Sequence, residues 1–305
     1  SVAVYGGKLA VALESKSNKQ EAGKVVVFNT STYALIKEIT VGALPDMITF
    51  SPDGKYIVTA NEGEPNDTYS LDPEGSVSII DVAANYAVTT LNFAQFSTQL
   101  SDLKTKGFRI ASVSNNFAND IEPEYVTISA DSKTAWVTLQ ENNGIAKIDL
   151  VTKKITQVFP LGYKDYSLAE NAIDISDKDA AVAFNPWKLK GMFQPDAISN
   201  FEVNKVQYIV TANEGDAREY SAFTDVRRIN HSSVILDPTI FPNALNNVTI
   251  ISPKVEPTFS APYFALAAIL SWSRLENLSE ISLKPSFTFF SIFDMLIGSP
   301  FISNF

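Results

Sequence analysis

An eight-residue segment occurs twice in this chain of 305 residues, at 56–63 and again at 208–215. Both copies read Tyr-Ile-Val-Thr-Ala-Asn-Glu-Gly, and each has a Pro-Asp pair upstream and an acidic, loop-like stretch downstream. A third, degenerate copy at 135–141 follows a Pro-Glu pair at 123–124. Self-similarity of this kind is the signature of a repeat architecture, so the repeat constrains the fold more than any local propensity does.

The surroundings of the first full copy read as short strands. Residues 47–50, 56–60, 76–81 and 87–93 are rich in β-branched and aromatic residues, and turn formers such as Ser-Pro-Asp-Gly at 51–54 separate them. Four antiparallel strands in about 50 residues are typical of one propeller blade. The sequence therefore predicts an all-β fold, namely a β-propeller of four-stranded antiparallel blades.

The whole chain, 1–305, is expected to form a single propeller domain. Recognisable blades are predicted at 1–42, 43–93, 121–161 and 194–250. Two stretches, 94–120 and 162–193, break the rhythm and are interpreted as insertions between blades. Short helices are expected in them near 96–104 and 168–173, and an additional strand pair is the alternative.

The remaining residues, 251–305, are assigned to further blades, although they match the repeat poorly. From 255 onward they carry only six charged residues, and the longest charge-free run is 257–273. This run is marginally short for a membrane span and is broken by Pro262, so buried strands are favoured over a membrane anchor. A further alternative is that the sequence of this stretch is partly misassigned or frame-shifted. We predict no integral membrane span.

Composition excludes several classes of function. The net charge of −10 and the pI near 4.7 argue against nucleic-acid binding, which needs clustered Lys and Arg, and suit cations or partners bridged by cations. The absence of cysteine excludes disulfides, thiolate catalysis and Cys-ligated zinc. His231 is the only histidine, which argues against His-based metal sites and Ser-His-Asp triads. No Gly-rich phosphate loop is present, and no organic cofactor is expected.

The repeat places acidic residues at equivalent points of successive blades. The start of a blade's first strand and the end of its second strand lie at the same end of the hairpin, so radial stacking brings these acids to one mouth of the channel. The acids concerned are Asp46, Glu124 and Asp196 at strand starts and Glu62, Glu141 and Glu214 at strand ends. Converging carboxylates repel one another unless cations neutralise them, and oxygen ligands at this density suit Ca²⁺ or Mg²⁺. Asp216, two residues beyond Glu214, is a further candidate ligand.

The same acids also have a purely structural interpretation. Acidic residues at strand ends commonly bond to backbone N–H groups, and Asn-Glu-Gly is ordinary turn chemistry. In that case the repeated acids only hold neighbouring blades together. A mixture of the two roles in different blades is the third alternative.

The second copy continues into a stretch with three arginines in eleven positions, Arg218, Arg227 and Arg228. Arginine forks bind phosphate or carboxylate bidentately. Beside a bound cation, Arg218 and Arg228 are therefore candidate catalytic residues for a phosphate ester, the metal polarising a phosphoryl oxygen and the arginine balancing the developing charge. Pairing with neighbouring acids is the alternative.

Two segments carry a resemblance to a known family. Residues 51–63 and 75–81, the latter reading Gly-Ser-Val-Ser-Ile-Ile-Asp, resemble YVTN-type, WD40-like propeller repeats. Together with Ala-Asn-Glu-Gly-Asp-Ala-Arg-Glu at 212–219, they make the chain similar to the choice-of-anchor I family, which includes mesenchyme-surface (biomineralisation-type) glycoproteins and proteins labelled alkaline-phosphatase-like. The resemblance extends over 1–245 and returns faintly at 290–294.

The resemblance implies an extracellular, periplasmic or cell-surface propeller, typically seven-bladed and often held to the envelope by a separate C-terminal element. It does not decide activity, because propellers host many functions. The favoured interpretation is a non-catalytic module that binds a divalent cation, with Ca²⁺ as the first choice, or a surface or matrix partner. The alternative is a metal-dependent phosphohydrolase acting on a phosphorylated small molecule. There Glu62, Glu214 and Asp216 would hold Ca²⁺, and Arg218 or Arg228 would meet the phosphate.

Overall fold

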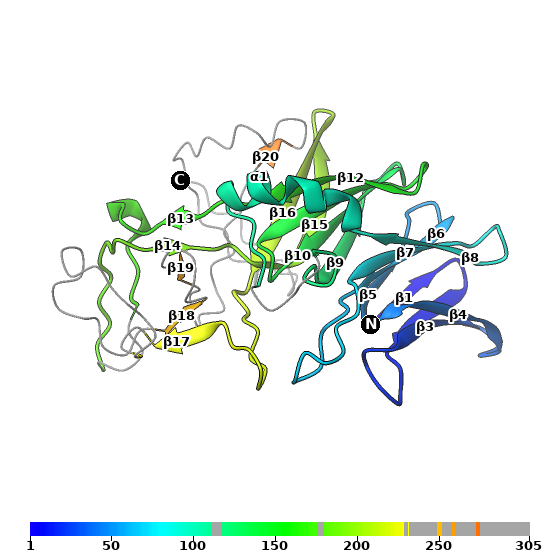
Figure 1. Ribbon diagram of the computed structural model, residues 1–305. Coiled ribbons are helices and arrows are strands. Elements are labelled where there is room, and N and C mark those ends of the chain that lie inside the picture. Colours follow the sequence, from blue (N-terminus) through cyan, green and yellow to red (C-terminus); the bar gives the residue numbers. More distant parts are fainter. Residues whose placement is uncertain are drawn as a thin grey trace.

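Short antiparallel strands make up almost all of the regular structure in the computed structural model (Figure 1). The structure describes residues 1–111, 117–175, 180–228, 231, 249–251, 258–259 and 273–274.

Three four-stranded antiparallel sheets follow one another along the chain, each with its strands in sequence order. Blade 1 comprises β1 (Val2–Tyr5), β2 (Lys8–Leu13), β3 (Ala22–Asn29) and β4 (Leu35–Ala43). Blade 2 comprises β5 (Pro45–Phe50), β6 (Tyr56–Asn61), β7 (Ser76–Asp81) and β8 (Ala87–Asn92). Blade 3 comprises β9 (Pro123–Ile128), β10 (Thr134–Leu139), β11 (Gly144–Asp149) and β12 (Lys154–Pro160).

Two further sheets complete the described part. The fourth hairpin, β15 (Pro195–Val203) and β16 (Val206–Asn213), is joined by the short strand β20 (Ser273–Arg274). A separate sheet has the order β13, β14, β19, β18, β17. Its strands are β13 (Lys164–Asp165), β14 (Lys190–Gly191), β17 (Val226–Arg228), β18 (Thr249–Ile251) and β19 (Thr258–Phe259).

The first strands of successive sheets are neighbours in space. β1 contacts β5, β5 contacts β9, and β9 contacts β15, so the sheets fan out from a shared line (Figure 1). Four-stranded meanders stacked face to face in this manner are propeller blades. The predicted fold class, an all-β propeller of four-stranded antiparallel blades, is confirmed.

The two interrupting stretches contain the expected helices. The 3₁₀ helix η1 (Ala94–Gln99) and helix α1 (Leu100–Thr105) lie between β8 and β9, and the 3₁₀ helix η2 (Ala169–Asn171) lies in the second stretch. That stretch also supplies β13 and β14, so it holds the extra strand pair that was the alternative. The prediction of further blades in 251–305 falls outside the described residues, except for Ile251, β19 and β20. In the described part of the chain, no helix is both long and apolar enough to cross a membrane.

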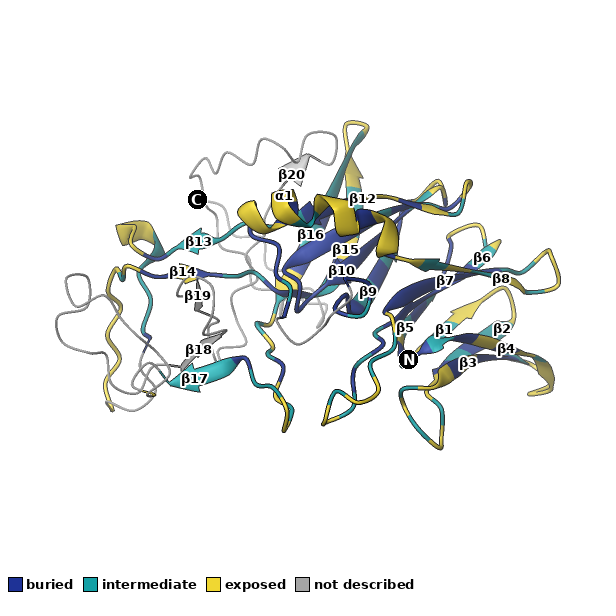
Figure 2. Cartoon of the chain, in the orientation of Figure 1, coloured by how far each residue is buried: buried dark blue, intermediate teal, exposed yellow. Residues whose placement is uncertain are grey.

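The inner strands β6 and β7 of blade 2 are buried on both faces because the blade lies between its two neighbours (Figure 2). Adjacent residues of a strand point to opposite faces. Ile57 accordingly packs into a cluster with blade 1, and Val58 packs into a second cluster with blade 3. This two-sided burial explains why the repeated segment reads as a continuous apolar run instead of alternating with polar residues.

The two identical segments form the same hairpin. In blade 2, Pro45 pairs with Asn61, and the register shifts before the next pairs; in the fourth hairpin, Pro195 pairs with Asn213 and the same shift follows. A matching side-chain hydrogen bond, from the threonine hydroxyl to the asparagine Oδ1, closes each strand end, at 2.9 Å in β6 and 3.0 Å in β16. The repeated sequence therefore encodes a repeated β-bulge as well as a repeated strand.

Gly75, directly before β7 of blade 2, lies against the segment that leads into β9 of blade 3. A Cβ at this position would lie 1.8 Å from the Ile121 carbonyl oxygen and 2.7 Å from Pro123 Cδ. We expect Gly75→Ala to lower the free energy of unfolding by about 3 kcal/mol, because backbone and a proline ring cannot move aside easily. Denaturant unfolding measures this change. The control is Gly6→Ala, where φ is +52° and the space is open, with an expected cost of about 1 kcal/mol. Equal costs would contradict the close approach of the two blades.

Candidate metal site

Three acids lie in β-bulges at the starts of first strands. Asp46 lies in the bulged segment of β5 and Asp196 in that of β15, each directly after the proline that opens the strand. Glu124 has the same place in β9, where the register with β10 shifts between Val137 and Leu139. Bulges re-aim side chains and are frequent next to functional sites. The repeat therefore directs one carboxylate per hairpin away from the regular strand pattern.

A second set of acids follows the second strands of the same hairpins. The Glu62 amide donates to the Leu44 carbonyl at 2.9 Å, and the Glu214 amide donates to the Gln194 carbonyl at 3.2 Å. Leu44 and Gln194 have left-handed φ values of 48° and 43°, so the two hairpins close with the same backbone geometry. Glu141 follows β10 at the equivalent position. The ends of β6 and β16 thus return an acid toward the start of their own hairpins.

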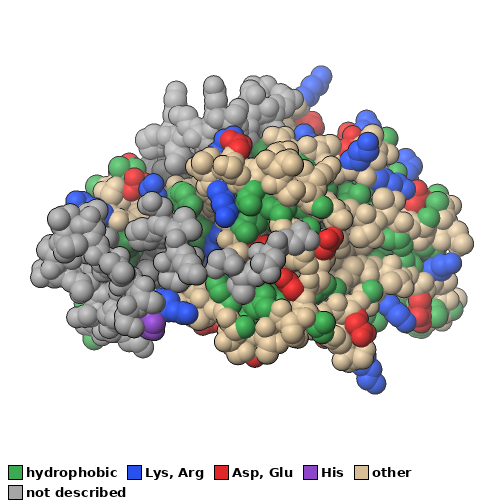
Figure 3. Space-filling model, in the orientation of Figure 1, with side chains coloured by type: hydrophobic (Ala, Val, Ile, Leu, Met, Phe, Trp, Pro, Cys, Tyr) green, Lys and Arg blue, Asp and Glu red, His purple; other side chains and the backbone are tan. Residues whose placement is uncertain are grey.

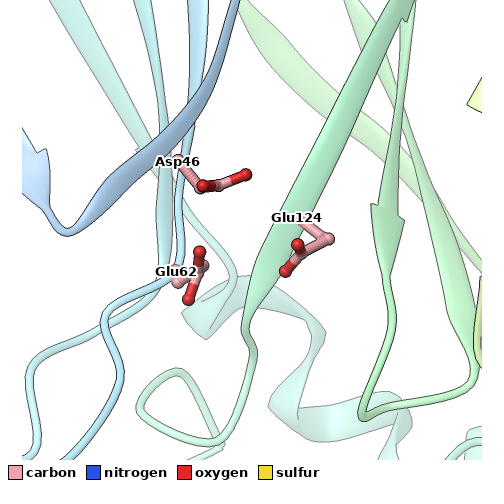
Figure 4. Close-up of side chains that lie close together, drawn as sticks. All are labelled: Asp46, Glu62 and Glu124. Carbon is pink, nitrogen blue, oxygen red and sulfur yellow. The ribbon is translucent and has the colours of Figure 1, made fainter. Parts of the chain in front are cut away.

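Asp46, Glu62 and Glu124 come together at one point between blades 2 and 3 (Figure 4). One carboxylate oxygen from each lies within 4.8 Å of the other two. We call these residues the carboxylate triad. Asp46 is exposed, and the other two are half-buried. Among the described residues, none of the three forms an ion pair with a lysine or arginine.

Burial and mutual repulsion raise the pKa values of these acids. Burial, followed by the charge of Glu124, raises the pKa of Glu62 to about 10. Burial, followed by the charges of Asp46 and Asp196, raises the pKa of Glu124 to about 8. The pKa of Asp196 is raised by burial and by Glu214. The acids of three hairpins therefore share one electrostatic environment, and in the absence of a cation part of the triad holds protons at neutral pH.

The acids of the fourth hairpin, β15 and β16, are not part of the carboxylate triad. Glu214 is exposed, and its carboxylate accepts a hydrogen bond from Gln140 Nε2 at 3.2 Å. Asp216 is exposed, its carboxylate accepts a hydrogen bond from the Ala217 amide at 2.7 Å, and its carbonyl accepts one from Gln194 Nε2 at 2.6 Å. Asp216 is thus engaged in its own turn, while Glu214 and Asp196 add negative potential beside the triad.

Arg218 lies in a buried ion cluster, which we define by Arg109, Asp120, Glu122, Arg218 and Asp225. Arg218 is 3% exposed. Its Nε donates to Glu122 Oε1 at 3.0 Å, and its two terminal nitrogens donate to the Asp120 carboxylate at 3.3 Å and the Asp120 carbonyl at 2.9 Å. Arg109 forms an ion pair with Asp225. The guanidinium that was a candidate for phosphate binding is therefore surrounded by carboxylates of this chain.

Asn142 links the members of the buried ion cluster. It is fully buried, and its Nδ2 donates to the carbonyls of Arg109 at 3.1 Å and Asp120 at 2.8 Å. Its Oδ1 accepts from the Glu122 amide at 3.2 Å. This cluster was not among the sites predicted from the sequence; its signal is the three acids within 120–124, where the insertion 94–120 meets the next blade. Arg228, the other candidate catalytic residue, lies on β17 in a separate sheet.

The loops that follow the two identical segments contact each other. The Ser221 amide donates to Asp67 Oδ1 at 2.7 Å, and the Tyr69 ring lies edge-on to Tyr220 with centroids 5.3 Å apart. This contact holds the segment that carries Arg218 against the loop that leads from Glu62 to β7. The two full copies of the repeat are therefore joined in space beyond their strands.

The fold and the site define the chain as a β-propeller with repeated acids at one mouth of its blades. A family model described as the Choice-of-anchor I domain matches residues 1–256, and the chain belongs to this family. No match was found among curated proteins.

Several solved structures resemble the chain weakly. Hydrazine synthase of Kuenenia stuttgartiensis is 11% identical over 70% of this chain and 55% of that chain, with a TM-score of 0.42. The β-propeller domain of the Trilobed protease from Pyrococcus furiosus is 13% identical over 70% of this chain and 54% of that chain, with a TM-score of 0.34. The Pan2 WD40 domain of Neurospora crassa is 8% identical over 71% of this chain and 47% of that chain, with a TM-score of 0.36. The chain spans about half the length of these structures, and at such TM-scores they carry no argument about activity.

Proposed function

We propose that this propeller is a non-catalytic binding module outside the cell or at its surface, and that the carboxylate triad binds a divalent cation. The observation that carries the proposal is the approach of three carboxylates to within 4.8 Å of one another with no basic partner among the described residues. Like charges at this separation oppose ionisation unless a cation neutralises them. On the face of the molecule drawn in Figure 3, by contrast, acidic and basic side chains are interspersed.

The chemistry of the triad favours Ca²⁺ over transition metals. Its three carboxylates are hard oxygen donors, and Ca²⁺ accepts 6–8 oxygens at roughly 2.3–2.6 Å in flexible geometry. Asp46 is exposed, so water or an acidic group of a partner molecule can complete the coordination shell. A surface or matrix partner bridged through the ion fits this arrangement. Mg²⁺ is the second choice, because it demands a stricter octahedron.

One observation supports a location outside the cell or at its surface. The chain belongs to the choice-of-anchor I domain family, whose name refers to attachment.

The alternative, a metal-dependent phosphohydrolase, needs Arg218 or Arg228 to reach a phosphate next to the ion. Arg218 is buried and bonded to Asp120 and Glu122, which favours a structural role. Hydrolysis of an aryl phosphate in the presence of Ca²⁺, lost in Arg218→Ala while the fold is kept, would favour this alternative.

Calcium titration tests the proposed function. We expect heat of binding in calorimetry and, at an ion concentration of 100 Kd, a stabilisation of about 2.7 kcal/mol. For a chain of this size the melting temperature then rises by roughly 4–6 °C. Glu62→Gln should weaken binding by more than about tenfold, since it removes a charged ligand. Glu202→Gln removes the same charge from an exposed site on β15 and should leave binding unchanged. A melting curve that is identical in chelator and in saturating Ca²⁺ would end the proposal.

A further inference from the structure

Blade 1 has an apolar face that is turned away from blade 2. Ala3, Ala10 and Val25 pack into the cluster that blades 1 and 2 share, and adjacent residues of a strand point to opposite faces. The opposite face of the sheet, which we call the open face, is formed by Val2, Val4, Leu9, Val11, Leu13, Val26 and Phe28. Val2 and Val4 are 65% and 66% exposed, and of the seven only Val26 is buried. Contiguous apolar faces that stay exposed mark interaction sites.

Blades 1 to 3 end their third strands alike. The last residues of β3, β7 and β11 are Asn29, Asp81 and Asp149. The Oδ1 atom of each accepts a hydrogen bond from a backbone amide two or three residues further on, at 2.9 to 3.1 Å. An apolar strand that ends in Asn or Asp therefore identifies the third strand of a blade and its turn to the fourth.

A segment near the end of the sequence repeats this motif. Residues 289–294, which lie outside the described residues, read Phe-Phe-Ser-Ile-Phe-Asp. Strand β7 reads Ser-Val-Ser-Ile-Ile-Asp, so the two are identical at the third, fourth and sixth positions and apolar at the second and fifth. The repeat therefore predicts that 289–294 form the third strand of a further blade.

The register of β7 predicts which way this strand faces. Val77 and Ile79 pack into the cluster with blade 3, the following blade, whereas Ile80 packs into the cluster with blade 1, the preceding one. Phe290 and Ile292 hold the positions of Val77 and Ile79 and are expected to face the blade that follows theirs. In a ring, blade 1 follows the last blade. The open face is the side of blade 1 on which a preceding blade packs.

A segment of this chain suits the open face better than a second copy does. Three strands about 4.8 Å apart, each presenting about six residues with a rise of about 3.4 Å, give a face of roughly 300 Å². A stable dimer buries about 800 Å² per partner. A tethered segment loses far less translational freedom on docking, so a smaller face is enough.

The composition and reach of the segment also fit. From 285 to 305 the only charged residue is Asp294, the turn residue of the motif, so the segment can cover an apolar face without burying other charges. The residues between Arg274 on β20 and the motif can span up to about 50 Å when extended. This reach is on the scale of a whole domain of this size.

We propose that residues 289–294 form the third strand of a closing blade that covers the open face of blade 1. The proposal is independent of the proposed function, because no residue of the carboxylate triad takes part in it. In the described blades the second strand of one blade contacts the first strand of the next, as β6 contacts β9, and the fourth contacts the third, as β4 contacts β7. The third strand of the closing blade is therefore expected to contact the second strand of blade 1, β2.

Cysteine crosslinking of the whole chain tests this placement, and the absence of native cysteine makes it specific. Packed sheets lie about 10 Å apart, so a bismaleimide of about that length should join Leu13→Cys to Ile292→Cys within one molecule at dilute protein concentration. Val151→Cys is the control partner, because Val151 lies on the turn after β11 and is 63% exposed.

The expected result is a crosslink within most molecules from Ile292→Cys to Leu13→Cys and little or none to Val151→Cys. Equal yields for the two partners, or no crosslink to either, would overturn the proposal. Crosslinks that form only between two molecules would overturn it as well, since they would place a second copy on the open face.

Melting curves give a second test that needs no crosslinker. Ile292→Asp places an unpaired charge between the closing blade and blade 1, so the melting temperature should fall by roughly 5 °C or more, or the chain should fail to fold. Ser303→Asp adds the same charge beyond the motif and should shift the melting temperature by less than about 1 °C. An unchanged melting temperature for Ile292→Asp would contradict the proposal, because a segment that packs against nothing tolerates a charge.

Discussion

Arg218→Ala is expected to lower the free energy of unfolding by about 3–5 kcal/mol, the usual cost of removing one partner from a buried ion pair. Arg218 is 3% exposed and bonds to both Asp120 and Glu122. Its loss leaves these carboxylates buried without a cation. The melting temperature should then fall by about 5–10 °C, or the variant should fail to accumulate in folded form.

Two further arginine variants make this expectation specific. Arg218→Lys keeps the charge, but one ammonium group cannot reproduce three directed hydrogen bonds, so it should recover only part of the loss. Arg227→Ala is the matched control, because Arg227 is half-buried and, among the described residues, its side chain donates only to the neighbouring Val226 carbonyl, at 2.8 Å. Its expected cost is under about 1 kcal/mol. Equal melting temperatures for Arg218→Ala and Arg227→Ala would contradict the buried ion cluster.

The metal-free protein is expected to lose stability as the pH rises from about 5 to 9. The pKa of Glu62 is raised to about 10 and that of Glu124 to about 8, above the ordinary value of 4.5. Between 4.5 and these values the folded state holds protons that the unfolded state has released. Stability from these groups is therefore fully present below pH 4.5 and is lost as the pH rises through the folded pKa values. Burial also raises the pKa of Glu122, to about 7, which acts in the same direction.

Melting curves in chelator at pH 5.5, 7 and 8.5 measure this loss. We expect the free energy of unfolding to decrease by about 2 kcal/mol and the melting temperature by on the order of 5 °C. The decrease is modest because the triad is partly exposed and solvent screens its repulsion. Added Ca²⁺ should remove most of the decrease and should bind more tightly at pH 8.5, because the ion competes with protons for the same oxygens. Glu62→Gln should flatten the metal-free profile, whereas Glu202→Gln should not. A metal-free protein that becomes more stable up to pH 8.5 would contradict the repulsion within the triad.

The sequence could predict the propeller and the meeting of the triad because both depend on local, repeated features. The octapeptide fixes the hairpin, and the preceding Pro-Asp or Pro-Glu pair fixes the bulge. Equivalent positions in stacked blades then lie at the same mouth. The repeat alone therefore predicts that Asp46, Glu62 and Glu124 lie near one another, without any knowledge of side-chain packing.

The buried ion cluster could not be predicted in the same manner, because long-range packing creates it. Arg109 comes from an insertion and Asp225 from the loop after β16, and nothing in either local sequence indicates the other as its partner. The same insertion explains why Glu141 and Glu214 differ in burial although the repeat makes them equivalent. The Arg109 amide donates a hydrogen bond to the Asn142 carbonyl at 2.8 Å, so the insertion lies next to Glu141, which is buried. Glu214 stays exposed.

Anomalous scattering from crystals grown in saturating Ca²⁺ tests the central claim most directly, because it locates the ion itself. The account predicts a peak between blades 2 and 3, at about 2.3–2.6 Å from carboxylate oxygens of Asp46, Glu62 and Glu124. Crystals in which those three carboxylates keep their positions and no peak lies between them would contradict it.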